Sequence, residues 1–288
     1  MIGVAPSGPN GYFQPLQLRE VTPEIENTSA ELSDPRLAAA VRIPDSAYVV
    51  ADLARLDVDL TGPMTFVGKG VCDANSGRDD ADVDLMERFA VIVAGMADGL
   101  PSERAAVRSE VAAKWACVAK HGAIGLVSLR TPKTTVLPWA STIAAYRSGA
   151  MGLVDRGTAV SRSAPCPALV VDVPAARAML AAVDRNLETE EARAASGKFD
   201  HFELPGTLRL RFHGSAKDLG SSNVIGRIAG SDPLLAREAI VISAHLDHLG
   251  VDGRGRSATA PSTMPPASHS CSPSPTRSSR YLMRHAVP

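Results

Sequence analysis

The longest apolar runs of this chain have the length of β-strands, and this limits the folds that it can adopt. Residues 89–96 read FAVIVAGM and residues 239–244 read AIVISA. A membrane-spanning helix needs about 20 apolar residues, so neither run predicts one. Several such runs are bounded by glycine and alternate with segments of helical periodicity. The pattern predicts an α/β fold.

The charge balance argues against binding to nucleic acid. The 288 residues are 45% hydrophobic and 21% charged, with a formal net charge of -1. Binding to nucleic acid depends on many contacts between basic side chains and phosphates, and the sequence has no cluster of Lys and Arg. We expect a soluble globular protein of one large or two smaller domains, with no nucleic-acid or membrane partner.

Alternating and helical patterns divide the chain into segments. Residues 12–21 and 207–214 alternate apolar with polar positions and predict half-buried strands. Between them, residues 102–122 predict one continuous helix, and a second helix opens at Pro174. The apolar stripe of the first helix contains Val107, Val111, Trp115 and Val118. We predict a polar, largely solvated connector at residues 186–200.

The cysteines and the last segment predict little structure of their own. No two cysteines form a C-x-x-C pair, so we expect buried free thiols rather than a zinc or redox motif. The four are Cys72, Cys117, Cys166 and Cys271.

Residues 253–288 contain no Asp or Glu and are rich in Ser, Pro, Ala, Thr and Arg. Such a composition cannot bury enough apolar surface to fold, so we predict a disordered tail.

The run VISAHLDHLG at residues 241–250 ends in two histidines and an aspartate. We expect a central strand covered on both faces, whose C-terminal end lies where open α/β sheets place ligands. Side chains alternate along a strand, so His245 and Asp247 point the same way. An imidazole is a good zinc ligand, and a nearby carboxylate can orient it. The spacing alone also allows His245 to cap the strand and His248 to lie on the surface.

The wider stretch SSNVIGRIAGSDPLLAREAIVISAHLDHLG, residues 221–250, resembles the aminopeptidase Y type of zinc-dependent exopeptidases. In that family a SxNVIG strand leads through a turn to an AHLDHLG strand end. Residues 3–18 look like the segment after the family's first helix. The block from MTFVGKG through RDDADVD, AVIVAG and HGAIGLVSL to LPWAS resembles the protease-associated (PA) domain that is inserted in many members. The resemblance covers roughly residues 3–252.

This resemblance implies a partial zinc-peptidase domain, with a three-layer sheet, that is interrupted by a compact α/β PA-like insert. The implied pieces are residues 1–49 and 184–252 for the peptidase domain, 50–183 for the insert and 253–288 for the tail. His245 would bind one of two co-catalytic zinc ions, Asp247 would be the catalytic-site carboxylate that orients it, and His248 has no assigned role. The implied reaction is hydrolysis of N-terminal residues from peptides, in a secreted or periplasmic protein.

Parts of the family pattern are missing from this chain. The family's other ligands and its general base lie C-terminal to AHLDHLG, but no acid follows Asp252, which is itself too close to His245 to bridge two metals. His269 and His285 lie in the irregular tail, where we expect no ligand role. We expect a chain that is truncated at both ends and catalytically incomplete. A frameshift near Gly255 is our hypothesis for the abrupt change.

Two other functions remain open from the sequence. The insert could act as a binding or lid module on a scaffold without activity. Its candidate lid residues are Trp139, Lys114 and Lys120, for which core packing and a solvated helix face are the alternative roles. A different metal hydrolase is a third hypothesis. The sequence predicts neither the preferred N-terminal residue nor the oligomeric state.

Overall fold

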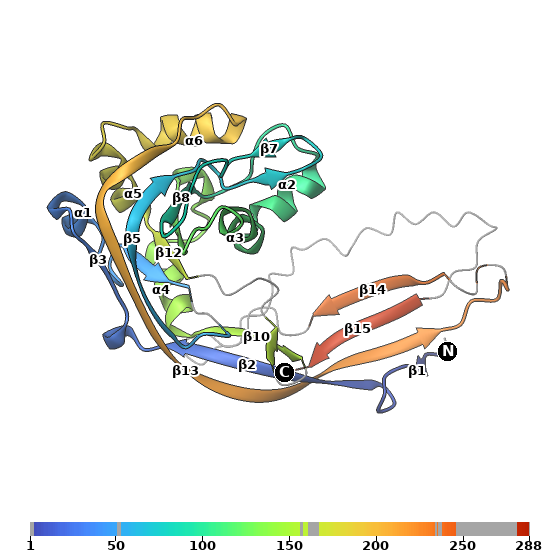
Figure 1. Ribbon diagram of the computed structural model, residues 1–288. Helices are drawn as coiled ribbons and strands as arrows, with labels where there is room; N and C mark the ends of the chain where they lie inside the picture. Colours follow the sequence, from blue (N-terminus) through green and yellow to red (C-terminus); the bar gives the residue numbers. More distant parts are fainter. Residues whose placement is uncertain are drawn as a thin grey trace. The chain divides into compact units, whose positions relative to one another are not determined.

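The computed structural model describes residues 3–50, 53–155, 158–160, 167–233, 235, 238–245 and 281–287 (Figure 1). The chain divides into two compact units. One unit is Arg19–Asp218, and the other combines Met1–Leu18 with Leu219–Pro288. The predicted insert, residues 50–183, lies within the first unit, and its boundaries stay a prediction. None of the helices in the described ranges is long and apolar enough to cross a membrane.

A mixed sheet forms the centre of the Arg19–Asp218 unit. Four of its strands are mutually parallel in the order β5-β8-β9-β12, and antiparallel strands border them, β13 next to β5 and β4 next to β12. The bounds are β5 Asp57–Phe66, β8 Phe89–Val93, β9 Gly125–Leu129, β12 Ala168–Val171, β13 Phe202–Ile228 and β4 Ala47–Val49. The prediction of an α/β fold is confirmed.

Helices cover this sheet on both faces. Alternate residues of β8 enter two separate cores, because successive side chains of a strand point to opposite faces. Val91 and Val93 pack in the core that contains residues of α1, α5 and α6, whereas Ala90 and Ile92 pack in the core of α3. The helices are α1 Pro35–Ala40, α2 Ser102–Ser109, α3 Val111–Ala119, α4 Trp139–Arg147, α5 Val173–Ala181 and α6 Leu187–Ser196. The unit therefore has three layers (Figure 1).

Shorter elements complete the chain. The strand β2, Phe13–Pro23, and the strand β13 each run through both units. The remaining elements of the Arg19–Asp218 unit are η1 Ile25–Asn27, β3 Ser29–Leu32, β6 Cys72–Asp73, β7 Arg78–Asp79, η2 Pro132–Thr134, β10 Ala150–Asp155 and β11 Thr158–Val160. β2 and β13 contain the two segments that the alternating pattern predicts as strands. Leu208 and Leu210 of β13 are fully buried, so that prediction is confirmed.

The predicted helix over residues 102–122 is wrong as one continuous element. The backbone of Glu110 is extended, with ψ 139°, and separates α2 from α3. Arg104 and Arg108 of α2 lie 3.2 Å and 3.6 Å from the buried carboxylate of Asp73. We attribute the break between the two helices to these ion pairs, because they fix the orientation of α2 through Arg104 and Arg108. As a result Val107 and Val111 are exposed, while Trp115 and Val118 are buried.

The predicted solvated connector at residues 186–200 is also wrong, because it contains the helix α6. Asn186 caps its first turn by accepting a hydrogen bond from Thr189 N at 3.0 Å, and Gly197 ends it with φ +73°. Glu190 and Glu191 are only 1% and 4% exposed. Their carboxylates are tolerated inside the protein because basic side chains from outside the helix reach them.

The second unit contains three further strands. β1, Ala5–Pro6, and β15, Tyr281–Val287, each pair with the end of β13, and β14, Ile240–His245, pairs with β15 in parallel. The prediction of disorder does not hold for residues 281–287, and residues 253–280 lie outside the described residues. The predicted burial of β14 on both faces is wrong. Its apolar side chains are 44–58% exposed, and among the described strands it pairs with β15 alone.

Candidate functional site

His245 is the last described residue of β14, so the predicted strand carries this histidine. In the register with β15, His245 lies opposite Ala286 and Ala244 lies opposite His285. The histidine at 285 therefore belongs to a strand rather than to an irregular tail. Asp247, His248, Asp252 and His269 lie outside the described residues. The roles of His245 and Asp247 stay predictions.

The described residues around this strand end do not fit a pair of zinc ions. The second unit has four carboxylates in its sequence, namely Asp232, Glu238, Asp247 and Asp252. The first two precede β14, on the connection between Ile228 and Ile240. Six strand residues span about 17 Å, so both lie near the far end of β14 from His245. Each zinc ion needs three or four protein ligands, and within the second unit these two carboxylates cannot supply them there.

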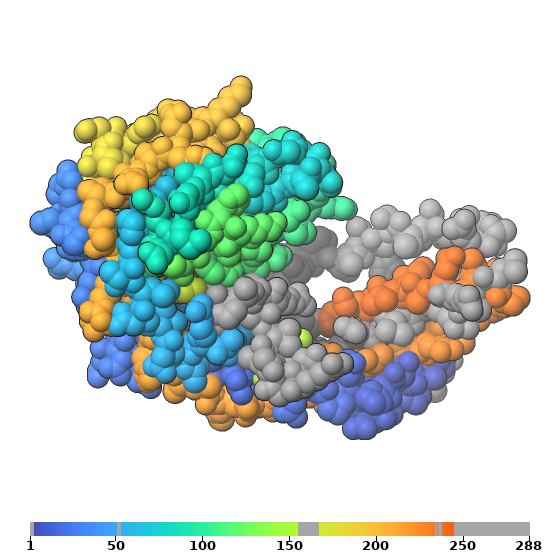
Figure 2. Space-filling view, viewed as in Figure 1, coloured from blue at the N-terminus to red at the C-terminus, as the bar shows by residue number. Residues whose placement is uncertain are grey.

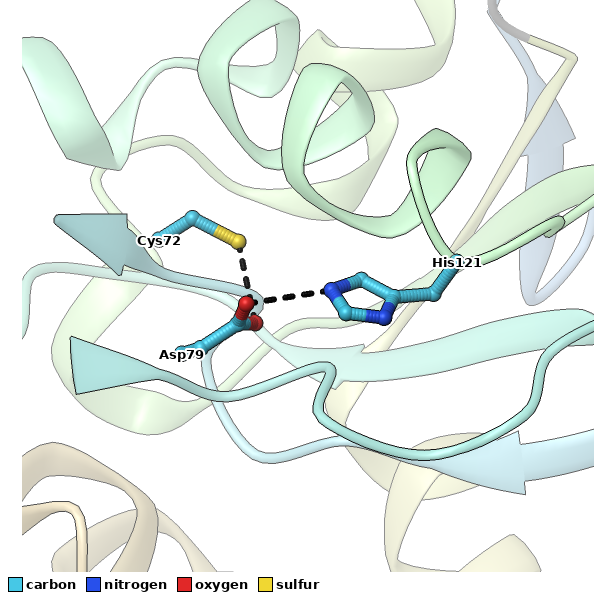
Figure 3. Close-up of side chains that lie close together, drawn as sticks. All are labelled: Cys72, Asp79 and His121. Carbon is cyan, nitrogen blue, oxygen red and sulfur yellow. Dashed lines mark hydrogen bonds and ion pairs between the residues drawn. The ribbon is translucent and has the colours of Figure 1, made fainter. Parts of the chain in front are cut away.

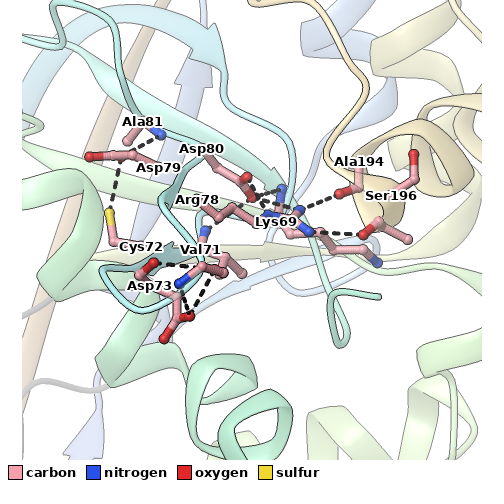
Figure 4. Close-up of polar contacts among 12 residues, drawn as sticks. Lys69, Val71, Cys72, Asp73, Arg78, Asp79, Asp80, Ala81, Ala194 and Ser196 are labelled. Carbon is pink, nitrogen blue, oxygen red and sulfur yellow. Dashed lines mark hydrogen bonds and ion pairs between the residues drawn. The ribbon is translucent and has the colours of Figure 1, made fainter. Parts of the chain in front are cut away.

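A cluster of buried charges lies in the other unit, around the loop after β5. Figure 4 shows three of its members, Lys69, Arg78 and Asp80. Lys114 of α3 is 2% exposed, and its Nζ donates hydrogen bonds to Lys69 O at 2.6 Å and Gly95 O at 3.1 Å. Lys69, also 2% exposed, donates from Nζ to Ala94 O at 2.7 Å and lies 4.0 Å from Glu191. We call this group the buried-lysine cluster, and it comprises Lys69, Lys114, Arg78, Asp80 and Glu191.

Asp80 and Arg78 connect this cluster to the end of α6. Asp80 Oδ2 accepts hydrogen bonds from the backbone N–H groups of Lys69 and Val71, each at 3.1 Å. Arg78 Nε donates to Asp80 Oδ1 at 2.7 Å, and its other nitrogens donate to the carbonyl oxygens of Ala194 and Ala195 at 2.6 Å and 3.0 Å. These carbonyls belong to the last turn of α6, where a cation is favoured. Arg78 therefore joins the loop to the helix.

Burial disfavours the charged form of both lysines. It lowers the pKa of Lys114 to about 7, and the nearby Lys69 ammonium adds to this effect. Burial also lowers the pKa of Lys69, against the opposing attraction of Glu191. Lys114 is thus neither a lid residue nor part of a solvated face, so both predicted roles are wrong. The sequence contains a signal for the burial of Lys114, because Val111, Lys114 and Val118 share the spacing of one helix face.

The other two predicted lid residues lie in different environments. Lys120 is exposed at the end of α3, in agreement with a solvated helix face. Trp139 is partly buried, and its indole N–H donates to Pro44 O at 3.3 Å. The Arg130 guanidinium lies 5.3 Å from the centre of the indole ring. The contacts of Trp139 fit its alternative role in packing.

Cys72 and Cys117 form a disulfide, which overturns the prediction of free thiols for these two residues. Their Cα atoms lie 5.3 Å apart although 45 residues separate them in the sequence. β6 carries the first cysteine and α3 the second, so the packing of this helix against the sheet brings them together. Cys166 and Cys271 lie outside the described residues.

Replacing both bonded cysteines by serine should lower the free energy of unfolding by about 2–4 kcal/mol, because the bond closes a long loop in the unfolded chain. Urea unfolding under non-reducing conditions would measure the loss. A chain with Cys166→Ser and Cys271→Ser is the matched control and should keep the wild-type midpoint. Equal midpoints for the two double variants would contradict the prediction.

One group of possible metal ligands occurs in the described residues, and it lies beside the disulfide (Figure 3). Atoms of Cys72, Asp79 and His121 all lie within 4.8 Å of one another. His121 Nε2 is 3.1 Å from Asp79 Oδ2, and Cys72 Sγ is 3.1 Å from Asp79 Oδ1. A disulfide sulfur carries no proton, so we read the sulfur–oxygen approach as a contact rather than a hydrogen bond.

No protein-family model and no curated protein matches this sequence. Solved structures similar to this chain include an aminopeptidase from Aneurinibacillus sp. strain AM-1, with 15% identity over 81% of this chain and 42% of that one, at a TM-score of 0.39. A peptidase M28 precursor from Shewanella amazonensis SB2B has 15% identity over 96% of this chain and 53% of that one, at a TM-score of 0.40. A zinc aminopeptidase from Bacillus subtilis has 13% identity over 81% and 41%, at a TM-score of 0.29.

The chain therefore spans about half the length of the solved structures that it resembles.

Proposed function

We propose that this chain is part of an aminopeptidase-type zinc peptidase scaffold and does not hydrolyse peptides by itself. The observation that supports the proposal is that the strand β14 carries His245, within the motif AHLDHLG. His245 is then a zinc ligand, Asp247 is the carboxylate that orients it, and an N-terminal residue of a peptide is what a whole site would release. The described carboxylates of the second unit, Asp232 and Glu238, precede β14, so the complete zinc pair needs ligands beyond these two.

The disulfide supports a location outside the reducing cytoplasm. Disulfides persist in secreted and periplasmic proteins and are rare in the cytosol. The bond between Cys72 and Cys117 therefore favours export of the protein. This agrees with the secreted or periplasmic location that the family resemblance implies.

A second candidate is a non-catalytic function, in which the PA-like insert, residues 50–183, binds peptides or covers a site. The observation that favours it is packing. The strands and helices of this region contribute side chains to two buried cores, whereas the apolar side chains of β14 are exposed. Peptide binding by the insert would need neither His245 nor zinc.

Metal analysis and an activity assay test the first proposal. The purified full chain, dialysed against zinc under non-reducing conditions, should retain less than one zinc ion and should not cleave an aminoacyl chromogenic substrate. His245→Ala should remove the residual zinc, whereas His213→Ala, at a histidine of β13 whose side chain is 41% exposed, is the control and should not. Two tightly bound zinc ions with steady turnover would overturn the proposed lack of activity. Unchanged zinc content in His245→Ala would overturn the ligand role.

Peptide binding separates the two candidates. The fluorescence anisotropy of labelled unstructured peptides would be measured with the full chain, before and after zinc is removed by a chelator. Binding that survives both the chelator and His245→Ala supports the binding module. Binding that is lost with either change supports a peptide site at the metal.

A further inference from the structure

The side chains of Cys72, Asp79 and His121 lie close together on the Arg19–Asp218 unit (Figure 3), and Cys72 is bonded to Cys117. We call this group the redox cluster, and its members are Cys72, Cys117, Asp79 and His121. The side chains of Asp79 and His121 are 41% and 24% exposed, so water reaches the cluster. Figure 2 shows the residues of β7, α2 and α3 as one continuous surface, and the cluster is built on β6, β7 and the end of α3.

We propose that the redox cluster is a metal site controlled by oxidation, closed while the disulfide is intact and able to bind a zinc-like divalent ion after reduction. Zinc prefers two to four thiolate or imidazole ligands, and carboxylate oxygens can complete the set. The cluster supplies two sulfurs, one imidazole nitrogen and one carboxylate. No other group of this kind occurs in the described parts of the chain.

The distances between the side chains suit a tetrahedral ion. Ligand atoms around one zinc ion lie about 3.3–3.8 Å apart, given the usual bond lengths. Asp79 Oδ2 lies 3.1 Å from His121 Nε2, and Asp79 Oδ1 lies 4.0 Å from Cys117 Sγ. Shifts of less than 1 Å in these pairs would reach the tetrahedral values. Two sulfurs that are bonded to each other cannot both bind the ion as thiolates, so reduction must come first.

The surroundings hold the carboxylate in place and leave it available. Asp79 Oδ1 accepts a hydrogen bond from Ala81 N at 3.1 Å, which orients the group as outer contacts orient metal ligands. The nearby arginines pair with other acids: Arg78 with Asp80, and Arg104 with Asp73. Among the described residues, the ion pair of Asp79 is with His121. Rotation of the His121 side chain can point its Nε2 at the ion.

The chemical steps balance with a dithiol as the reductant. The dithiol transfers two electrons and two protons to the disulfide, which gives two cysteine thiols and one oxidised dithiol. The metal ion then replaces both thiol protons, which pass to water. The oxidised dithiol reverses the sequence: it accepts two electrons from the two thiolates and two protons from water, so the sulfur–sulfur bond of the chain re-forms, the reduced dithiol is regenerated and the ion is released.

Cobalt(II) binding tests the proposal with the full chain in a background of Cys166→Ser and Cys271→Ser. A phosphine reduces the disulfide with one water molecule and becomes a phosphine oxide, so no competing thiol remains. After its removal under argon, the reduced chain should bind one cobalt ion with a thiolate-to-metal charge-transfer band and strong visible bands typical of tetrahedral cobalt. The oxidised chain should show neither. A reduced chain without these bands would overturn the proposal.

Single substitutions identify the ligands. His121→Ala and Asp79→Asn should each weaken cobalt binding at least tenfold, whereas His213→Ala should leave it unchanged. His245→Ala should also leave it unchanged, so the outcome does not depend on the proposed function. Wild-type affinity in both His121→Ala and Asp79→Asn would show that these residues are not ligands and would contradict the site.

A second measurement covers the case in which reduced variants lose their fold. In the reduced chain, zinc should slow alkylation of Cys72 and Cys117 by iodoacetamide at least tenfold, as read by mass spectrometry. It should also raise the thermal midpoint of the reduced chain, because a bound ion stabilises the folded state. Equal alkylation rates with and without zinc would overturn the proposal.

Discussion

Replacing Glu191 by alanine should lower the free energy of unfolding by about 3–5 kcal/mol, the usual cost of removing one partner of a buried ion pair. The side chain of Lys69 is 3% exposed and lies 4.0 Å from Glu191. The Thr131 hydroxyl, fully buried, donates a hydrogen bond of 2.8 Å to Glu191 Oε1. The substitution therefore leaves a buried ammonium and a buried hydroxyl without their carboxylate. Urea unfolding at neutral pH would measure the change.

Glu188 provides a matched control on the same helix. It pairs with Arg177 on the surface, where both side chains are about half exposed, and such pairs are screened by water. Glu188→Ala should therefore change the unfolding midpoint little. A double variant, Lys69→Met with Glu191→Leu, should recover most of the loss because it removes both charges. If Glu191→Ala unfolds at the same urea concentration as Glu188→Ala, the buried pair does not stabilise the fold.

Raising the pH from about 7 to about 10 should stabilise the chain through Lys114, and Lys114→Met should remove most of this rise. The pKa of Lys114 falls from 10.5 to about 7 on folding, chiefly because of burial. Between these values the unfolded chain holds a proton that the folded chain has released, so the free energy of unfolding increases with pH. The stabilisation is complete above the unfolded pKa and is lost as the pH falls through the folded pKa. The full window corresponds to a few kcal/mol.

Urea unfolding across this pH range would test the slope. The background should carry Cys166→Ser and Cys271→Ser, because free thiolates attack disulfides at alkaline pH. The groups that face Lys114 are Lys69 and Arg78, which lower its pKa, and Asp80, which raises it. Lys69 also has a lowered pKa and leaves a residual slope in the variant. Lys120→Met, at an exposed position after α3, should keep the wild-type slope, and an equal slope in Lys114→Met would refute the prediction.

The elements that the sequence predicts well are those whose signal is local. The strand β8 lies within the apolar run of residues 89–96, and the helix predicted to open at Pro174 is α5, which begins one residue earlier, at Val173. The strand β14 that carries His245 is also visible in the sequence, because a run of apolar residues leads to this histidine. In each case residues within one segment decide the type of element.

The errors arise where partners come from distant parts of the chain. α6 looks like a solvated connector because its acids are polar, yet Lys69, far back in the sequence, lies 4.0 Å from the buried Glu191. The break between α2 and α3 at Glu110 accompanies ion pairs with Asp73, far back in the sequence. The hydrophobic periodicity of a segment carries no information about such contacts. Contacts made in the folded chain therefore override the local pattern.

The redox cluster is a candidate site that the sequence alone does not predict. The spacing of the cysteines contains no metal or redox motif, and only the packing of α3 on the sheet brings Cys117 to Cys72. The candidate at His245 is the opposite case, since its motif lies within a few residues and is readable from the sequence. Asp232 and Glu238 precede β14, so their distance from His245 depends on the length of this strand.

The sequence by itself determined the α/β class, the strands β2, β8 and β13 and the strand β14 that carries His245, because hydrophobic periodicity acts over neighbouring residues. Tertiary structure alone decided the disulfide, the burial of Lys114 and the exposure of β14. These three depend on which surfaces meet in the folded chain. Whether a polar group can be buried, or a thiol oxidised, depends on partners that only folding brings within reach.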